Sequence, residues 1–349
     1  MMVQKKIDKL PQNVVLELTY KCNHQCKFCS CPWYSPYSNY PINEELKYED
    51  WCRAIDKLFM LGVRHFSISG GECLLKDCLA DILRYIHKRS GELYLPQKMV
   101  LISNGLRMSE EYLRLFKETG VFLSMSLPGI ETFEYHTGVD NAKGVLKWFT
   151  RAKELGIQTT LNVTVTQKNY YELYETLAEG IINGADSVLI NRFLPGGRGL
   201  KFQNDLLLSV KQLNGLLDTA EEVLSLCNRK GFIGTEYPKC IIKDPTKYKH
   251  VSIGTYCAAA KDFFVIGPSG EIRVCNHSPR IVGNILNDKI IDDEEYFNMF
   301  AQSNYQPEIC KECVSSPICD CGCREVSNIL LGSANQIEPS LKDYIKLQK

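Results

Sequence analysis

The sequence predicts an α/β fold in which a parallel sheet forms a partial (β/α)6 barrel, followed by a cysteine-rich C-terminal part. Strand-like and helix-like segments alternate through the first two thirds of the 349 residues, the pattern of a parallel sheet covered by helices. Six such units are too few for a closed eight-stranded barrel. Cysteine is abundant, with sixteen residues, and cysteines dominate the last third of the chain.

Each expected strand is a short apolar or alternating run, and a helical pattern follows it. Turn and cap residues mark several ends: Asn104-Gly105 closes the third strand, and Ser109 is the expected N-cap of the next helix. The expected strands cover 13–18, 63–69, 98–103, 121–127, 158–166 and 187–193, and the expected helices cover 48–61, 77–88, 110–118, 141–155 and 169–183.

The pattern changes after residue 199. One long helix is expected over 209–230, and then short β-like pieces over 263–266 and 271–274 flank Pro268-Ser269-Gly270. We therefore expect two parts, a barrel core with its following helix over 1–231 and a cysteine-rich domain over 232–349.

The charge balance limits the classes of partner. Lys+Arg and Asp+Glu are both 41, so the formal net charge is zero. This balance argues against broad electrostatic capture of nucleic acid or of an anionic membrane. The first residues contain no apolar signal segment, and no apolar run reaches the length of a membrane span. We expect a cytoplasmic protein without nucleic-acid or membrane partners, in which metal ligation explains the cysteines better than disulfides do.

Three cysteines directly after the first expected strand form the strongest motif. Cys22-x3-Cys26-x2-Cys29 would arise by chance roughly 0.03 times in a chain of this length and composition. Three thiolates on one short loop suit a [4Fe–4S] cluster with one iron left open for a substrate or cofactor. The alternative is a structural zinc site completed by His24 or Cys31.

This motif resembles that of the radical S-adenosylmethionine (SAM) superfamily. The resemblance implies that the three cysteines hold the cluster and that the open iron chelates the amino and carboxylate groups of the methionine moiety. It also implies that an external electron donor supplies one electron, which cleaves SAM to a 5′-deoxyadenosyl radical that abstracts a substrate hydrogen.

Further segments resemble cofactor-binding positions of the same family. Gly70-Gly71-Glu72 resembles the motif that binds the methionine ammonium, although Cys73 stands where the family has proline. Arg192 could bind the methionine carboxylate or the substrate, or form a structural ion pair, and His136 is expected only to pack or cap. The cofactor contacts that the resemblance implies are Phe28, Gly70, Gly71, Glu72, Ser126, Asn162, Arg192 and Leu194; for Phe28, Ser126 and Asn162 ordinary structural roles remain the alternative.

A second cysteine group resembles the SPASM domain, which binds auxiliary [4Fe–4S] clusters. The pattern is Cys257, then Gly270-x4-Cys275, then a CxxCx5Cx3C run; without the resemblance, one or two zinc sites would also fit. The resemblance implies one or two auxiliary clusters, the first on Cys257, Cys275 and Cys323 and the second on Cys310, Cys313 and Cys319.

The ligand sets of these clusters are incomplete in the sequence. No cysteine follows Cys323, so the last ligand that the family uses is missing. Cys321 is the expected substitute, and Asp320 and Asp343 are candidate oxygen ligands. The first auxiliary cluster also lacks a fourth ligand, for which Cys240 is a candidate.

The resemblance implies an enzyme, an oxidoreductase or maturase that modifies a precursor peptide by cross-linking, thioether formation, epimerisation or oxidation. Only 21 residues precede Cys22, so we expect a leader peptide to bind a separate protein or to add a strand to a sheet edge. The alternatives are a radical dehydrogenase of a small alcohol, such as a carbohydrate or aminoglycoside, and a non-catalytic metal-binding scaffold.

Overall fold

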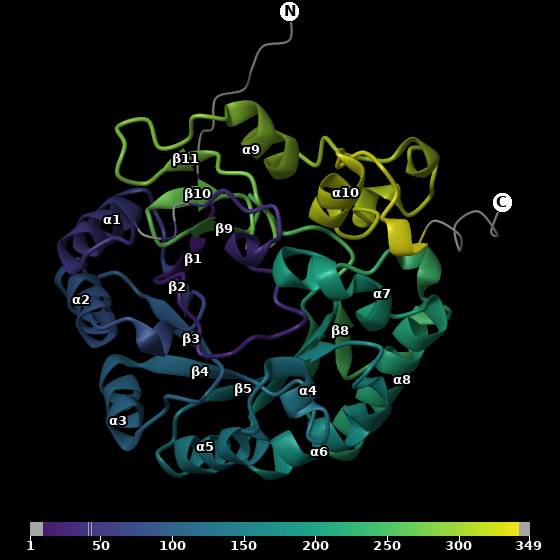
Figure 1. Ribbon diagram of the computed structural model, residues 1–349, viewed down its shortest axis with the longest axis horizontal. Helices are drawn as coiled ribbons and strands as arrows, with labels where there is room; N and C mark the ends of the chain where they lie inside the picture. Colours follow the sequence, from purple (N-terminus) through teal and green to yellow (C-terminus); the bar gives the residue numbers. More distant parts are fainter. Residues whose placement is uncertain (1–9, 41, 43, 342–349) are drawn as a thin grey trace, which may run out of the picture.

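The structure, a computed structural model, describes residues 10–40, 42 and 44–341. Its centre is an eleven-stranded sheet with the order β11-β10-β9-β1-β2-β3-β4-β5-β6-β7-β8. The strands curve around the middle of the molecule, and the helices α1, α2, α3, α5 and α6 lie outside them (Figure 1). The two ends of the sheet do not pair with each other, so the barrel is open and the expected α/β class is confirmed.

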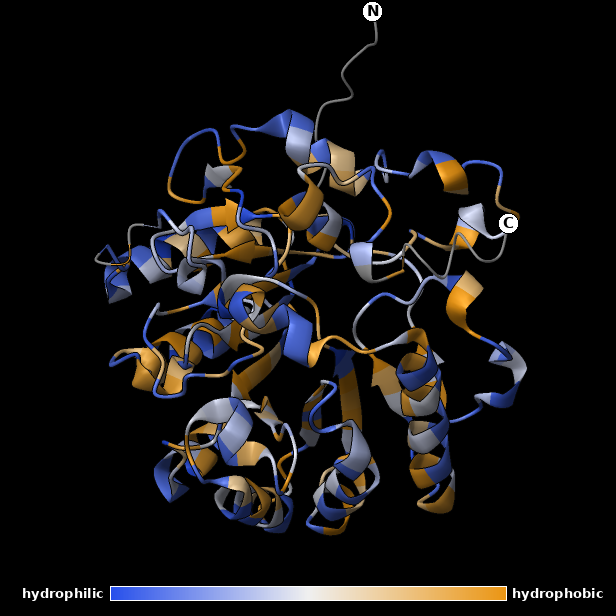
Figure 2. Cartoon of the chain, turned by 45° about the vertical axis from the view of Figure 1, so that its right-hand side comes forward, coloured by the Kyte–Doolittle hydropathy of each residue, from blue (hydrophilic) through white to orange (hydrophobic). Residues whose placement is uncertain are grey.

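The six expected strand–helix units are present. The strands β1 to β6 pair in parallel, each with the next along the chain. The buried residues of α1 include Trp51, Ala54, Ile55 and Leu58. This helical spacing turns one face of the helix to the sheet. The outer helices in Figure 2 accordingly show both hydrophobic and hydrophilic sides. The strands are β1 (Asn13–Glu17), β2 (His65–Ser69), β3 (Lys98–Ser103), β4 (Val121–Ser126), β5 (Thr159–Val165) and β6 (Ser187–Arg192), and the helices are α1 (Tyr48–Met60), α2 (Leu79–Glu92), α3 (Glu110–Thr119), α5 (Ala142–Glu154), α6 (Leu173–Ile182) and α8 (Val210–Leu226).

The C-terminal third extends this sheet from both ends. Strands β7 and β8 continue the parallel order after β6, while β9 pairs in parallel with β1 and carries β10 and β11 antiparallel beside it. The expected β-like pieces over 263–266 and 271–274 are present as β9 and β10, whereas β7, β8 and β11 are too short for periodicity to reveal them. The proposed boundary after residue 231 lies within β7, so both parts share one sheet. The C-terminal third adds β7 (Gly231–Ile233), β8 (Val251–Ile253), β9 (Phe263–Ile266), β10 (Glu271–Arg273), β11 (Gly283–Asn284), α9 (Glu294–Ala301) and α10 (Arg324–Leu331), and the short helices α4 (Phe133–Thr137) and α7 (Gln203–Leu206) lie earlier in the chain.

A buried ion pair links β10, in the C-terminal third, to the end of β1. The guanidinium of Arg273, on β10, pairs with the carboxylate of Glu17 at the end of β1. Asn276 donates its Nδ2–H to Glu17 Oε1 at 2.9 Å, and the side chains of Arg273 and Glu17 are buried. Since Glu17 lies five residues before Cys22 and Arg273 lies two residues before Cys275, this contact brings the two cysteine regions side by side.

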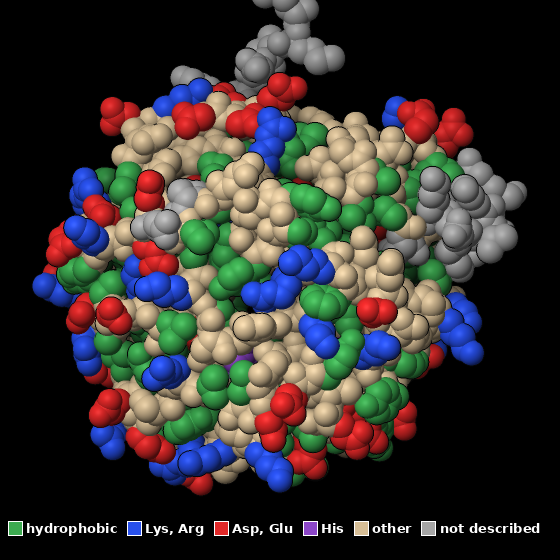
Figure 3. All heavy atoms as spheres, viewed as in Figure 1, with side chains coloured by type: hydrophobic (Ala, Val, Ile, Leu, Met, Phe, Trp, Pro, Cys, Tyr) green, Lys and Arg blue, Asp and Glu red, His purple; other side chains and the backbone are tan. Residues whose placement is uncertain are grey.

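Acidic and basic side chains are intermixed around the rim of the face shown in Figure 3, in keeping with the balanced composition. Across the part of the chain that the structure describes, every helix is too short or too polar to cross a bilayer.

Candidate functional site

The carboxyl ends of the parallel strands surround a cavity of about 420 Å³. Sites gather at this edge in parallel α/β folds, because the loops that follow the strands converge there. Both three-cysteine groups, although far apart in the sequence, line this cavity. The lining includes Cys22, Cys26, Cys29, Ser69, Gly70, Gly71, Glu72, Asn104, Ser126, Asn162, Arg192, Cys257, Cys275 and Cys323.

The first cysteine loop is attached to α4 by its backbone. The amides of Gln25 and Lys27 donate to the carbonyls of Thr137 and His136, each at 2.8 Å. His136 is fully buried, and its ring nitrogens lie 2.9 Å from Thr132 O and from Thr166 Oγ1. The histidine therefore packs and orders α4, and α4 in turn positions the cysteine loop.

The electrostatic environment of the three thiols combines burial with one nearby cation. Burial raises the pKa of Cys22 to about 11 and raises the pKa of Cys26, whereas a hydrogen bond from the Cys31 thiol lowers the pKa of Cys29 to about 7. The Arg198 guanidinium acts to lower the pKa of all three thiols, and it donates to Cys26 O at 3.3 Å. Sequence reasoning missed Arg198, because no motif spacing marks it.

Gly70 and Gly71 allow two chain segments to cross. The amides of Gly71 and Glu72 donate to the carbonyls of Thr19 and Lys21, both at 2.8 Å, which ties this loop to the segment entering the cysteine motif. Gly70 has a φ of +148°, and a Cβ atom on Gly71 would lie 2.2 Å from Lys21 O. In the structure these glycines admit the backbone of the neighbouring segment; they also line the central cavity, and their contact with a cofactor stays a prediction.

Glu72 lines the cavity and also anchors the turn after β3. Its carboxylate accepts from the Asn104 amide at 2.8 Å, from Ser103 Oγ at 2.8 Å and from the Leu74 amide at 3.1 Å. Burial raises its pKa. Asn104 Nδ2 donates to Asn23 Oδ1 at 2.7 Å and lies 3.9 Å from Cys22 Sγ. Asn104, expected only as a turn residue, thus connects Glu72 to the first cysteine.

The crossing at Gly71 leads to a first prediction. Gly71→Ala forces the Cβ atom against Lys21 O, so the cysteine loop must shift, and we expect the free energy of unfolding to fall by about 1–3 kcal/mol and iron loading to drop. The control is Gly91→Ala in α2, where an added Cβ meets no atom within 4 Å; there we expect a gain of about 0.4–1 kcal/mol. Urea denaturation and iron analysis measure both variants. Unchanged stability and iron loading in Gly71→Ala would contradict the crossing.

The other expected cofactor contacts divide into two groups. Phe28, Ser126, Asn162 and Leu194 line the same cavity as the cysteines, and their roles stay predictions. Arg192 also borders it, but its guanidinium donates to Glu338 Oε1 at 2.6 Å and Oε2 at 2.7 Å, and to Glu236 O.

The side chains of Arg192 and Glu338 are both buried, with 2% and 0% exposed. The structure therefore favours the ion-pair alternative for Arg192, because its planar fork is already matched by a carboxylate.

The second cysteine region forms two separate groups. Cys257, Cys275 and Cys323 line the central cavity together with the Glu236 side chain. A different pocket brings together five cysteines, namely Cys240, Cys310, Cys313, Cys319 and Cys321. Cys240, a candidate for the first auxiliary group, thus lines the pocket of the other group.

The two candidate oxygen ligands fare differently. Asp320 Oδ2 accepts from the Cys257 amide at 2.7 Å, from Lys261 Nζ at 2.6 Å and from Tyr305 Oη at 3.0 Å. Oδ2 of this carboxylate thus orders the Cys257 loop, and a ligand role for Asp320 stays a prediction. Asp343 lies outside the described residues.

The donor set at the central cavity fits an iron–sulfur cluster with an added cofactor. Three thiols from one loop face the cavity, and one buried polar atom of a lining residue, His24 Nε2, has no hydrogen-bond partner among the described residues. In residues 10–40, 42 and 44–341, no group of three or more His, Cys, Asp or Glu side chains has the compact arrangement of a single-ion site.

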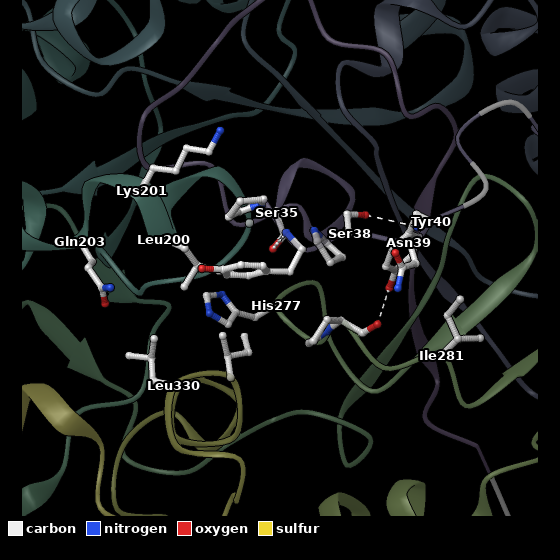
Figure 4. A pocket seen from close by; sticks show the side chains of 16 residues that line it. Ser35, Ser38, Asn39, Tyr40, Leu200, Lys201, Gln203, His277, Ile281 and Leu330 are labelled. Atoms are coloured by element: carbon white, nitrogen blue, oxygen red, sulfur yellow. Dashed lines mark hydrogen bonds between the residues drawn. The ribbon is translucent and has the colours of Figure 1, made fainter.

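A second, outer cavity of about 750 Å³ adjoins the first. His277 lines both cavities, and its Nε2–H donates to Pro195 O at 2.7 Å. Figure 4 shows side chains converging on this space from separate segments: Leu200 and Gln203 from the residues around α7, Leu330 from the end of α10, and Tyr40 from the loop after the cysteine motif. The outer cavity thus offers apolar, aromatic and amide groups beside His277.

Comparisons with known proteins agree with this arrangement. The model of the radical SAM superfamily matches residues 16–179. The PqqA peptide cyclase of Bradyrhizobium diazoefficiens is 26% identical over 348 residues, covering 95% of this chain and 86% of that protein, and that of Granulibacter bethesdensis is 26% identical over 343 residues, covering 95% and 87%.

Two solved structures share the fold. One is Streptococcus suis SuiB bound to the precursor peptide SuiA, with a TM-score of 0.71, 16% identity, and coverage of 95% of this chain and 76% of that one. The other is anSMEcpe with bound AdoMet and the Kp18Cys peptide, with a TM-score of 0.70, 17% identity, and coverage of 95% and 94%.

Proposed function

Because the chain belongs to the radical SAM superfamily, we propose that it is a maturase that modifies a ribosomally made precursor peptide after radical abstraction of a substrate hydrogen. The observation that carries this proposal is the central cavity, which a loop of three cysteines and a second group of three both line at the carboxyl edge of a parallel sheet. Such a site can place a radical source, an electron acceptor and a substrate within one enclosed space.

The residues of the cavity divide into two cofactor sites. Cys22, Cys26 and Cys29 would hold a [4Fe–4S] cluster with an open iron for SAM, and Cys257, Cys275 and Cys323 would hold an auxiliary cluster. When bound, the first cluster and SAM supply the 5′-deoxyadenosyl radical. The chain's own contribution is to enclose the site and to keep its donors in place.

The side chains around the first cysteine loop suit this task. His24, with its buried unpartnered Nε2, offers a hydrogen bond to a bound group, and burial lowers its pKa to about 4, so the ring is neutral at neutral pH. Phe28 offers an apolar face for the adenine, and Asn162 and Ser126 offer hydrogen bonds from neighbouring strand ends. Glu72 offers a carboxylate for the methionine ammonium.

A peptide substrate is favoured by the outer cavity. Its lining mixes the rings of Tyr37 and Tyr40 with the amides of Asn39 and Gln203 and the cation of Lys201, a combination that suits a peptide backbone with varied side chains. The name of the PqqA peptide cyclases and the peptides bound in the SuiB and anSMEcpe structures support the same substrate class.

Two partners complete the proposal. An external donor supplies the electron for SAM cleavage, and a separate leader-binding protein presents the peptide. The described sheet ends at β8 and β11, whose outer edges are the places where an added strand could pair.

Anaerobic reconstitution with iron, sulfide, reductant and SAM tests the proposal. We expect formation of 5′-deoxyadenosine and a mass shift on a candidate precursor peptide encoded beside the gene. Absence of 5′-deoxyadenosine from a protein with loaded clusters would reject the enzyme and support a metal-binding scaffold. Formation of 5′-deoxyadenosine together with a two-hydrogen loss from a small alcohol, and an unchanged peptide, would support the dehydrogenase instead.

A further inference from the structure

Five cysteines gather around one small pocket remote from the three-cysteine loop. Cys310, Cys313, Cys319 and Cys321 come from the C-terminal run, and Cys240 comes from a separate segment that precedes Cys257. The pocket is mostly apolar and is closed by Pro238 and Ile337. A [4Fe–4S] cluster needs four protein thiolates when no iron is left open, so the pocket contains one thiol more than the cluster requires.

The turn that carries Cys240 is held on both sides. Before it, the amide of the buried residue Tyr237 donates to Gly254 O at 2.9 Å. After it, Ile241 is fully buried and its carbonyl accepts from Asn214 Nδ2 at 2.7 Å. Cys240 itself is exposed, so nothing in the hydrophobic core requires a cysteine there, while its neighbours hold it in place.

The same turn contacts one of the expected ligands directly. The amide of Lys239 donates to Cys319 Sγ at 3.4 Å. Main-chain N–H groups that donate to a ligating sulfur are a regular part of iron–sulfur sites, where they stabilise the negative charge on the sulfur. The backbone next to Cys240 thus already belongs to the surroundings of Cys319.

Resting on the proposed function, we propose that Cys240 is the fourth ligand of the second auxiliary cluster, beside Cys310, Cys313 and Cys319. It replaces the last cysteine of the family pattern, which this sequence lacks. Unlike that cysteine, Cys240 precedes the other three ligands in the chain. Cys321 is the competing thiol, since it lies within hydrogen-bonding reach of the Cys310 and Cys319 thiols. Its Sγ, however, is directed at Cys319 O at 3.8 Å, only two residues along the same backbone.

The geometry of the two thiols separates their roles. Cys240 approaches the pocket from a different segment than the other ligands, so four sulfurs can surround a cluster. Cys321 has a left-handed backbone with a φ of 63°, and its carbonyl accepts from the buried Arg324. Cys321 therefore shapes the turn between Cys319 and Cys323 and leaves the fourth position to Cys240.

The test compares Cys240→Ala, Cys240→Ser and Cys321→Ala with the control Cys227→Ala, an exposed cysteine at the end of α8. All four are made in full-length protein in which Cys22, Cys26 and Cys29 are already alanine, so only auxiliary iron remains. The readouts are iron and sulfide per chain and the electron paramagnetic resonance spectrum after reduction.

We expect Cys240→Ala to lose about four irons per chain or to yield a three-iron cluster with a distinct spectrum. Cys240→Ser is expected to keep iron with a shifted spectrum, and Cys321→Ala and Cys227→Ala are expected to match the parent. Parent-like iron and spectrum in Cys240→Ala, or loss of the cluster in Cys321→Ala alone, would overturn the assignment. The parent of these variants lacks Cys22, Cys26 and Cys29 and is not expected to cleave SAM. The iron, sulfide and spectral results therefore do not depend on the outcome of the 5′-deoxyadenosine test.

Discussion

Replacing Cys22, Cys26 and Cys29 together with alanine is expected to abolish 5′-deoxyadenosine formation and to remove about four irons per chain. The three thiols lie on one loop that faces the central cavity. Without them, too few thiols remain on that loop to hold a cluster. Iron on the second cysteine region should stay, because its thiols come from separate segments ordered by their own contacts, such as the Asp320 bonds to Cys257 and Lys261.

The measurement combines iron analysis with chromatographic detection of 5′-deoxyadenosine under reducing, oxygen-free conditions. Cys227→Ala is the matched control, since Cys227 is exposed at the end of α8 and its loss should change neither readout. SAM cleavage that persists in the triple variant at the parental rate would disprove the role of this loop. Loss of all iron from the triple variant would disprove the independence of the second region.

Arg192→Met is expected to lower the free energy of unfolding by about 3–5 kcal/mol, because it removes one side of a buried ion pair, the Arg192 guanidinium that faces the Glu338 carboxylate. Arg192 and Glu338 join the end of β6 to residues near the end of the described chain, through two hydrogen bonds of 2.6 and 2.7 Å. Glu338 Oε2 also accepts from the Cys323 amide at 2.9 Å. The ion pair thus helps to position Cys323, a proposed cluster ligand.

Urea denaturation of the single variants and of Arg192→Met/Glu338→Met forms a double-mutant cycle that isolates the pair. The double variant should recover much of the lost stability, since apolar groups then replace both buried charges of the pair. Affinity for SAM, measured by calorimetry on folded protein, should stay within a few-fold of the parent. A large loss of SAM affinity at unchanged stability would instead restore the role of Arg192 as a carboxylate-binding residue.

Local patterns were sufficient to predict the six strand–helix units, since each depends on residues near one another in the chain. The buried face of α1 and the alternation of β5 are examples, because helical and strand periods are visible within one segment. The Cys22-x3-Cys26-x2-Cys29 loop and Gly70-Gly71-Glu72 were equally local signals, and the structure places both on the central cavity.

Contacts between distant segments could not be read in this way. Arg198 approaches the cysteine loop, and Asn104 bridges Glu72 and Cys22, yet neither has a spacing that marks it. The glycine pair showed the same limit: its motif was visible, but the clash with Lys21 O that explains Gly71 exists only once two segments cross.

The sequence by itself determined the α/β class, the order of the core elements and the two sets of cysteines, because propensity, periodicity and ligand spacing are properties of short stretches. Only the tertiary structure decided that both three-cysteine groups share a cavity, that Arg192 is matched by Glu338, and that Cys240 lies with Cys310, Cys313 and Cys319. These results depend on pairing β9 with β1 and on docking the turn at Cys240. Such long-range contacts arise from packing of the whole chain and leave no local pattern.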